Sequence, residues 1–147
     1  MSKQHVMVDI ETLGRGPYAP VVSIGAVAFD PDVSGDNIGS TFHRKMTFKA
    51  ASYQRVPDQS TLDWWAKQPA EAQAALLIDQ IDDVAGVLTE FCEWFPEGAF
   101  VWGNGPTFDI TILETLFQPR AFHTRRSISK SCVESRFKLT FSSTIKF

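Results

Sequence analysis

The sequence predicts one α/β domain in which helices flank a mixed central sheet, with an incomplete C-terminal part. Three observations predict this fold: apolar strand patterns in the first fifty residues, a helical apolar stripe between residues 81 and 95, and a strand, turn and helix pattern over residues 100–117. The chain of 147 residues is the size of one domain, and its hydrophobic fraction of 44% excludes a disordered protein.

Three strands are expected first. Residues 5–10 form a short apolar strand, and residues 21–29 form a continuous apolar run of the kind found in strands covered on both faces. Residues 40–48 alternate weakly, which favours a strand at the edge of the sheet. Glycines and prolines between residues 14 and 20, and an Asp-Pro-Asp turn beginning at residue 30, separate the strands.

Helices follow the strands. Ser60 and Asp63 have the spacing of a capping box and open a helix that continues through residue 65. Pro69 begins the next helix, which ends near residue 77. Asp79 caps the clearest helix, and a strand over residues 100–102, a tight turn and a helix capped by Thr107 complete the order. The stripe of the clearest helix consists of Ile81, Val84, Ala85, Leu88, Phe91, Cys92 and Phe95.

Two acidic side chains share one face of the first strand. Residues i and i+2 of a strand point to the same side, so Asp9 and Glu11 project together. They repel each other there, and a hard divalent cation between them would remove the repulsion. Asp109, in the first turn of the last expected helix, adds a third carboxylate from a distant segment. The three predict a metal site; the alternative is a solvated strand end and a helix cap.

The segments around these acids resemble a known family. Residues 6–14, 21–29 and 102–109 are similar to the DEDD, or DnaQ-like, superfamily of 3′–5′ exonucleases, and within it to the phage and prophage branch of exodeoxyribonuclease VIII-like proteins. The resemblance covers roughly residues 4–117 and includes the residues that surround each acid. It implies a ribonuclease H-like fold with the first strand in its interior, and hydrolysis of nucleic-acid phosphodiesters from 3′ ends.

The resemblance also implies roles for individual residues. Asp9 would bridge two divalent cations, Mg²⁺ or Mn²⁺. Glu11 would help to hold the ion that carries the attacking water, and Asp109 would support the ion near the leaving oxygen. Thr12 and Leu13 would contact the terminal nucleotide through their backbone and an apolar wedge, unless they are an ordinary exit from the strand.

A second set of residues is assigned to the substrate by the same resemblance. Trp64 or its neighbour Trp65 would stack on or border the terminal base, although core packing is a simpler explanation for either ring. Adjacent helical residues point about 100° apart, so the two rings cannot share one role. Asn104 holds the turn before Asp109 or contacts the nucleotide, and none of the three histidines receives a catalytic role.

Residues 119–147 form an atypical basic tail, rich in Ser and Thr, after an exonuclease domain expected over residues 1–118. Residues 1–119 carry 7 Lys and Arg against 16 Asp and Glu, a net charge of −9, whereas residues 120–147 carry a net charge of +6. The third motif of the family, His-x-x-x-x-Asp, is missing: no Asp follows Asp109, and the only later histidine, His123, has Ile128 five positions on. A frameshift or truncation near residue 118 explains this, and a natural basic tail is the alternative.

The sequence leaves three functions open. The leading hypothesis is a metal-dependent 3′–5′ exonuclease crippled by loss of the third motif. The alternatives are an inactive nucleic-acid or metal-binding remnant, and a ribonuclease H-like interaction module whose carboxylates cap local structure. The expected partners are 3′ ends of DNA or RNA, between which the sequence does not choose, and a homo-oligomer is compatible with it. No signal peptide or membrane span is recognisable, so a cytoplasmic protein without a membrane partner is expected.

Overall fold

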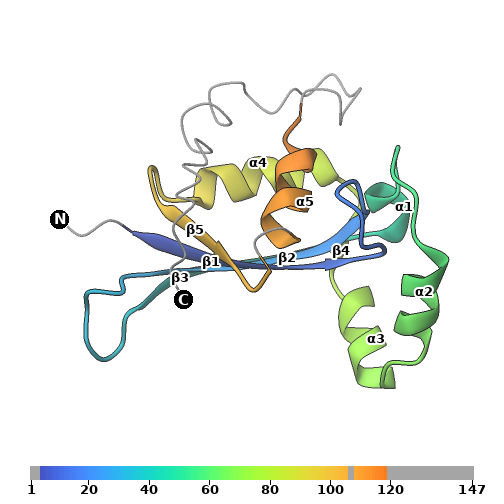
Figure 1. Ribbon diagram of the computed structural model, residues 1–147, viewed down its shortest axis with the longest axis horizontal. Coiled ribbons are helices and arrows are strands. Elements are labelled where there is room, and N and C mark those ends of the chain that lie inside the picture. Colours follow the sequence, from blue (N-terminus) through green and yellow to red (C-terminus); the bar gives the residue numbers. More distant parts are fainter. Residues whose placement is uncertain (1–3, 106–107, 119–147) are drawn as a thin grey trace.

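A mixed five-stranded sheet forms the centre of the computed structural model, which describes residues 4–105 and 108–118 (Figure 1). The strand order is β4-β3-β2-β1-β5. The strands are β1 (His5–Thr12), β2 (Val21–Phe29), β3 (Ile38–Met46), β4 (Gln80–Ile81) and β5 (Phe100–Gly103). The helices are α1 (Phe48–Ala51), α2 (Gln59–Ala66), α3 (Ala70–Leu77), α4 (Val84–Trp94) and α5 (Asp109–Leu116). The mixed sheet with flanking helices is the predicted fold, and the prediction is confirmed.

β1 is an interior strand with different neighbours on its two sides. It pairs antiparallel with β2 along its whole length and parallel with β5 along its first half only. β5 ends at Gly103, which lies opposite Val8. The second half of β1 carries both acids of the first motif. It has β2 on one side, and within residues 4–105 and 108–118 no strand pairs with its other side beyond the end of β5.

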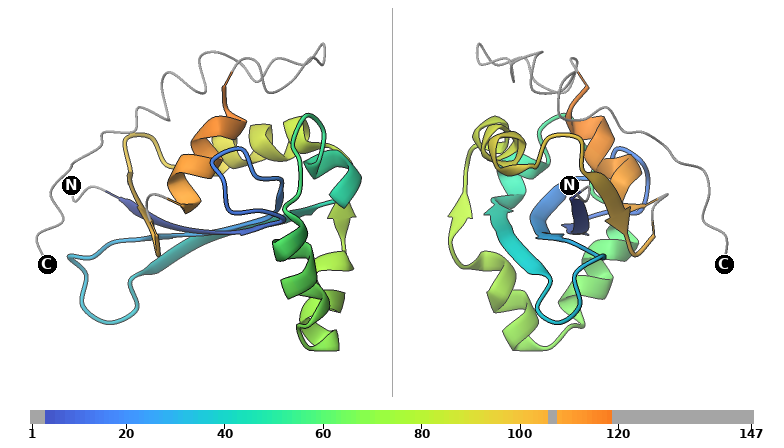
Figure 2. Two further views of the ribbon diagram at one scale, coloured as in Figure 1. Left: turned by 45° about the vertical axis from the view of Figure 1, so that its right-hand side comes forward. Right: turned by 90° about the vertical axis from the view of Figure 1, so that its left-hand side faces the viewer.

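The helices cover the sheet unequally. α4 and α5 lie on one face, and α2 and α3 extend from the opposite side at the end of the sheet where β4 lies (Figures 1 and 2). The side chains of β1 alternate between the two faces of the sheet. Val6, Val8 and Ile10 are buried under α4 and α5, and Met7 and Asp9 are exposed on the other face.

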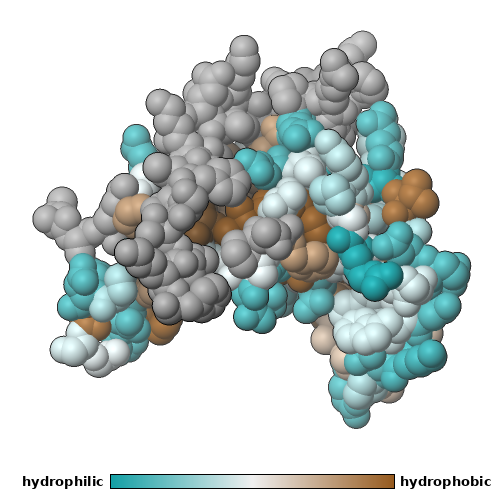
Figure 3. All heavy atoms as spheres, viewed as in Figure 1, coloured by the Kyte–Doolittle hydropathy of each residue, from teal (hydrophilic) through white to brown (hydrophobic). Residues whose placement is uncertain are grey.

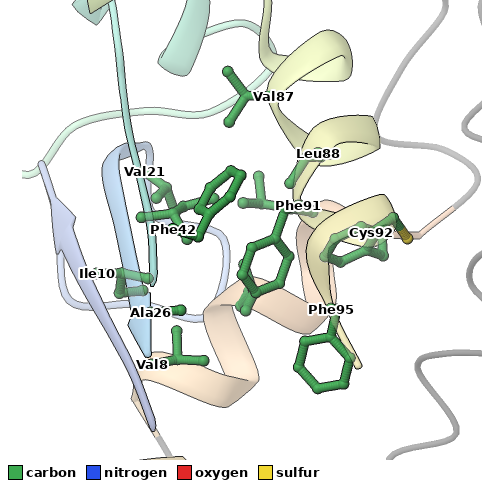
Figure 4. Packing of buried hydrophobic residues seen from close by; sticks show 14 of the residues in the cluster. Val8, Ile10, Val21, Ala26, Phe42, Val87, Leu88, Phe91, Cys92 and Phe95 are labelled. Atoms are coloured by element: carbon green, nitrogen blue, oxygen red, sulfur yellow. The ribbon is translucent and has the colours of Figure 1, made fainter. Parts of the chain in front are cut away.

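Phe91 of α4 is the centre of the main core. Its side chain is fully buried, and its ring lies 5.1 Å from that of Phe42 on β3 and 6.4 Å from that of Phe117 after α5. Figure 4 shows the Phe91 ring pointing from α4 toward the sheet, on the side where Phe42, Val8 and Ile10 lie. The apolar side of α4 thus packs against both the sheet and the end of α5.

A second, smaller cluster holds α2 and α3 against the sheet. Leu13 at the end of β1 packs with Val22, Ala51 and Leu76, and the side chains of Leu62 and Trp65 cover it. This cluster fixes α2 beside the residues that directly follow Glu11.

Two predicted helix starts are wrong, and backbone geometry gives the reason. α2 begins after Asp58, so Ser60 lies inside the helix rather than at its cap. α4 is capped by Asp83, whose Oδ1 accepts the Gly86 N–H at 2.9 Å. Asp79 instead has a left-handed backbone with φ of 57°, because the chain first pairs with β3 as the two-residue strand β4.

The third strand is also displaced from its predicted range of 40–48. It begins at residue 38, where it pairs with Phe29, and it ends at residue 46. Thr47 then caps α1, and its Oγ1 accepts the Ala50 N–H at 3.1 Å. Pairing with β4 covers only the last two residues of β3, so most of its outer edge is free in the described part of the chain, as an edge strand requires.

The C-terminal predictions fall outside the described residues. Thr107, the expected cap of α5, lies outside the residues that the structure describes, as does the whole range 119–147. The boundary after residue 118 stays a prediction. No helix within residues 4–105 and 108–118 is long and apolar enough to cross a bilayer.

Candidate active site

The two acids of β1 project from the sheet face that α4 and α5 do not cover. Asp9 is exposed and Glu11 is half-buried, and their backbone partners on β2 are Gly25 and Ser23. The buried residues Val8 and Ile10 alternate with them and anchor the strand in the core. The shared face predicted for Asp9 and Glu11 is present.

Asp109 approaches the same part of β1 from α5. It is the first residue of that helix and is 4% exposed. Its Oδ1 accepts the backbone N–H of Ile10 at 3.3 Å, and Ile10 is the residue between the two other acids. This contact is made at the edge of β1 that β5 leaves free. Gly103 permits the approach, since a Cβ there would lie only 3.3 Å from the Asp109 Cβ.

Arg55 links the helix that carries Asp109 to the loop after β1. Its guanidinium donates to the Ala19 carbonyl at 3.0 Å and to the Thr115 hydroxyl oxygen at 2.9 Å. The Thr115 oxygen also lies 2.9 Å from the Pro17 carbonyl, so the loop and α5 share one polar junction. Burial lowers the pKa of Arg55, and the side chain serves here as a multiple hydrogen-bond donor.

The three carboxylates disfavour one another's charge. Burial raises the pKa of Glu11, and repulsion from Asp9 and then from Asp109 raises it further. Burial also raises the pKa of Asp109, with repulsion from Asp9 adding to it, while the N–H of Ile10 opposes the rise by stabilising the anion. Negative charge therefore accumulates at this edge of the sheet, and a bound cation would reduce its cost.

The chemistry of these donors suits a hard divalent cation. Carboxylate oxygens are the ligands that Mg²⁺ and Mn²⁺ prefer, and the mutual repulsion of the three groups would be relieved by an ion among them. As the side chains are placed, no three His, Cys, Asp or Glu residues of the described chain are close enough together to hold a metal ion. The three acids thus fit a metal by donor type and charge, without standing in a finished ligand shell.

A cavity of about 340 Å³ opens beside Glu11. The end of β1 and the loop after it form one wall, and α2 forms the other. Its lining residues are Ile10, Glu11, Thr12, Gly14, Arg15, Ser60, Thr61, Trp64, Trp65 and Phe108. In the view of Figure 3, the part of the molecule formed by α2 and α3 is mostly hydrophilic. A volume of this size accommodates a small organic ligand.

The two tryptophans of α2 occupy different positions, as their angular separation predicts. Trp64 is 53% exposed and presents its ring to the cavity. Trp65 is half-buried against Leu13, and its indole N–H donates to the Thr12 carbonyl at 2.9 Å. The rings meet edge to face at 4.9 Å. Trp64 is therefore the residue available to a ligand, and Trp65 is a structural contact of β1.

The remaining predicted substrate residues differ in access. Thr12 lines the cavity, although its side chain is buried and its hydroxyl donates to the Gly14 carbonyl at 2.6 Å. The Leu13 side chain is 1% exposed and lies in the second core cluster, so it does not extend into the cavity as a wedge. Asn104 is exposed in the turn after β5 and is not among the described lining residues of the cavity.

Two residues of this site were missed by sequence reasoning. Arg15 supplies the cation of the cavity wall, and Asp58 holds the Arg15 backbone N–H through its Oδ2 at 2.9 Å. Asp58 precedes Gln59, the first residue of α2, and an acid at that position is a recognisable helix cap. Its bond to the loop after β1, 43 residues earlier in the chain, has no signal in the sequence.

Comparison with known proteins identifies the family. The family model described as "3′-5′ exoribonuclease Rv2179c-like domain" matches residues 4–141. The chain belongs to this family. An exodeoxyribonuclease of Enterobacteria phage T4 is 26% identical over 127 residues, which cover 76% of this chain and 55% of the phage protein. The chain thus spans about half the length of this curated relative. The predicted membership of the DnaQ-like exonuclease superfamily is confirmed.

Solved structures of exonuclease I share the fold. The E. coli enzyme in complex with a dT13 oligonucleotide has a TM-score of 0.54 and 18% identity, covering 79% of this chain and 24% of that chain. The zinc-bound complex of the same enzyme with single-stranded DNA has a TM-score of 0.55 and 18% identity, over 80% and 24% of the two chains. At this identity the likeness establishes the ribonuclease H-like architecture, and the chain corresponds to about a quarter of those proteins.

Proposed function

We propose that this domain is a metal-dependent 3′–5′ exonuclease whose turnover is slow. The observation that carries the proposal is the bond from the Ile10 N–H to Asp109 Oδ1, at 3.3 Å. It brings the third acid to the strand segment that carries Asp9 and Glu11, beside a cavity of about 340 Å³. Family membership supplies the reaction, and the three carboxylates near this part of β1 supply donors for the ions that phosphodiester hydrolysis uses.

In this proposal the three acids are the metal ligands. Asp9 projects from the open sheet face and would contact both ions. Glu11 would hold the ion at the cavity side, and Asp109, fixed by the Ile10 N–H, would hold the other. Bound divalent ions supply a nucleophilic water and neutralise charge on the phosphate and the leaving oxygen. Mg²⁺ and Mn²⁺ are the proposed ions because all three donors are carboxylates.

The cavity would receive the terminal nucleotide of the substrate. Trp64 presents an aromatic ring on which a base can stack, and Arg15 offers a guanidinium to a phosphate. Thr12 belongs to the wall opposite Trp64. Leu13 packs in the second core cluster and supports that wall from behind, and Asn104 stays a candidate contact for nucleotides outside the cavity. Both DNA and RNA are retained as substrates, since the family is described by an exoribonuclease and the phage relative is an exodeoxyribonuclease.

Slow turnover follows from the sequence after Asp109. No later Asp is present to complete the site of the nucleophile, and no later His occurs five positions before an Asp. Loss of a general base typically costs about 10²–10⁴-fold in rate. We place the chain in the exodeoxyribonuclease VIII-like branch, and we propose that a change of reading frame near codon 118 removed the third motif. A His-x-x-x-x-Asp in another frame of the nucleotide sequence would support that origin.

The test uses 5′-end-labelled single-stranded DNA and RNA with Mn²⁺, and Asp9→Asn as the control for contaminating nucleases. Slow, metal-dependent shortening from the 3′ end that the variant lacks is the expected result. Adding a family-type C-terminal segment with His-x-x-x-x-Asp should raise the rate. Rapid digestion by the unmodified chain would contradict the proposed impairment, and internal cleavage would contradict the exonuclease.

The second candidate is a binding remnant without catalysis, and the missing third motif is the observation that favours it. Such a protein would bind oligonucleotides or Mn²⁺ and leave the substrate intact over long incubations. An interaction module is the third alternative, and it predicts no divalent-ion binding at all. Equilibrium binding measured beside the nuclease assay separates the three.

A further inference from the structure

Three hydrogen bonds strap the chain after Glu11 to α2 and to its N-cap residue, Asp58. The indole N–H of Trp65 donates to the Thr12 carbonyl at 2.9 Å. The backbone N–H of Asp58 donates to the Leu13 carbonyl at 2.8 Å. The backbone N–H of Arg15 donates to Asp58 Oδ2 at 2.9 Å. Every one of these bonds joins residues 12–15 to residues 58–65, so the two walls of the cavity are tied together directly.

Asp58 uses its carboxylate in an unusual way for a helix cap. Its backbone is extended, with φ of −81° and ψ of 129°, as an N-cap residue requires. Its side chain nevertheless makes no capping bond to α2 and reaches Arg15 instead. A side-chain capping bond typically stabilises the helix that it caps. In this protein the Asp58 carboxylate accepts its hydrogen bond from the loop after β1 and not from α2.

Gly14 makes the strap possible by its lack of a side chain. A Cβ at this position would lie 3.2 Å from Asp58 Oδ2 and 3.2 Å from the Ala19 Cβ. The Asp58 carboxylate therefore fits against the bare backbone of the loop. The close fit restricts the backbone of the nearby residues Thr12 and Arg15, which both line the cavity.

The strap joins the two walls of the cavity and holds the backbone of its one basic residue, Arg15. Among the lining residues, all of which are described, Arg15 is the only Lys or Arg. Its backbone is held by Asp58, while Trp64 stands on the same helix as Asp58 and faces the cavity. A ligand that contacts both the guanidinium and the Trp64 ring requires the separation that the strap fixes.

We propose that Asp58 is a positioning residue for nucleotide binding, acting through the Arg15 backbone. This inference rests on the proposed function, because it takes a nucleoside monophosphate as the occupant of the cavity. Trp65 is the second member of the strap and fixes the Thr12 carbonyl. Neither residue needs to touch the ligand. Their effect is to keep residues 12–15 at the spacing from α2 that the nucleotide requires.

Asp58→Ser and Asp58→Asn are a matched pair for the test. Both remove one negative charge, and both residues are good N-caps. Asn keeps an acceptor oxygen at the reach of the original carboxylate and retains the bond to Arg15. Ser is too short for that bond, and its hydroxyl is free to cap α2. Asp58→Ser should therefore melt at or above the temperature of Asp58→Asn and bind the nucleotide less well.

Binding of AMP and dAMP, the mononucleotide probes, is measured by NMR titration with Ca²⁺ as a diamagnetic divalent ion. The expected result is a dissociation constant about five- to tenfold higher for Asp58→Ser than for the parent, and within twofold of the parent for Asp58→Asn. On a single-stranded oligonucleotide, KM should rise by a similar factor with kcat changed less. A purely structural role would make binding follow melting temperature, which is the opposite order.

Trp65→Phe tests the second bond, with Trp94→Phe as its control. Both changes remove an indole N–H, but the Trp94 N–H is buried with no hydrogen-bond partner in the described chain. Only Trp65→Phe should weaken AMP binding. If Asp58→Asn binds as weakly as Asp58→Ser, charge rather than the bond is responsible and the proposal is wrong. The proposal is wrong also if neither Asp58→Ser nor Trp65→Phe changes the affinity for AMP.

The same measurements separate this inference from the proposed function. A parent chain that binds AMP but shortens no oligonucleotide would refute the exonuclease, and the Asp58 pair would still decide the positioning role. A parent chain that binds neither AMP nor dAMP would overturn the positioning role, since no nucleotide would then be positioned. Shortening of oligonucleotides by that chain would leave the exonuclease standing alone.

Discussion

Asp9→Asn should stabilise the metal-free protein and remove its response to Mn²⁺. Asp9 is exposed on the open sheet face and raises the pKa of both Glu11 and Asp109 by repulsion. Neutralising it removes two unfavourable charge pairs while leaving the shape of the side chain unchanged. The same change deletes the carboxylate proposed to contact both ions.

The expected gain is about 1 kcal/mol. A strand rises about 3.3 Å per residue, so the carboxylates of Asp9 and Glu11 are separated by about 6.6 Å along β1. Two unit charges at that distance repel by about 0.6 kcal/mol in a water-like dielectric, which is the right choice for an exposed side chain. Repulsion from Asp109 adds a comparable amount at low salt. For a domain of this size, about 1 kcal/mol raises the melting temperature by about 3–5 °C.

Thermal unfolding in EDTA and in increasing Mn²⁺ gives the comparison. An ion at about 100 times its dissociation constant stabilises the folded state by about 2.7 kcal/mol, so the parent chain should overtake the variant as Mn²⁺ is added. Asp32→Asn, an exposed acid in the turn after β2, controls for the general loss of one negative charge. An Asp9→Asn protein that is less stable in EDTA, or that keeps the full Mn²⁺ response, would refute the reasoning.

Four further outcomes are expected. In EDTA, urea stability of the parent relative to Glu11→Gln should fall as pH rises, because the raised pKa values of Glu11 and Asp109 make their contribution complete at low pH and lost above the folded-state pKa. Phe91→Ala should cost about 3–5 kcal/mol in urea unfolding, since its buried ring packs against Phe42 of β3 and Phe117 after α5. Gly103→Ala should displace Asp109 and weaken Mn²⁺ stabilisation more than it lowers stability in EDTA. Oligonucleotide binding should depend weakly on NaCl, with a log–log slope near −0.7, if Arg15 is the only phosphate contact.

The layers of this fold follow from patterns that are local in sequence. The apolar run of β2 occurs as predicted, and the residues of the predicted stripe from Val84 to Cys92 are buried on α4. Ile81, the first residue of that stripe, lies in β4 instead. The two wrong caps depend on tertiary pairing instead. Asp79 could not cap α4 once the next residue, Gln80, paired with Lys45 of β3. Such pairing joins segments 35 residues apart, and no local pattern encodes it.

The site also combines features that a local sequence pattern predicts with features that depend on tertiary pairing. The shared face of Asp9 and Glu11 is a consequence of strand periodicity, which the sequence contains. The approach of Asp109 to the Ile10 N–H depends on β5 ending opposite Val8, and this length difference is a property of the sheet. The family resemblance points to Asp109 as the third acid, which strand periodicity alone could not do. It did not supply Asp58, whose bond to Arg15 crosses between two elements.

Charge sets the strongest physical constraint on the proposed activity. Residues 1–119 carry a net charge of −9, yet the substrate would be a polyanion. Three of the described cations are already engaged: Arg44 pairs with Glu90 at 2.8 Å, Lys45 donates to the Ala75 carbonyl, and Arg55 joins the loop to α5. Near the acids this leaves Arg15. Attraction for a phosphate must therefore come chiefly from divalent ions held by the carboxylates, which makes the acidic site necessary for substrate binding as well as for hydrolysis. EDTA should then abolish oligonucleotide binding under conditions where added NaCl only weakens it, and a steep NaCl dependence that survives EDTA would assign binding to the basic residues after 119.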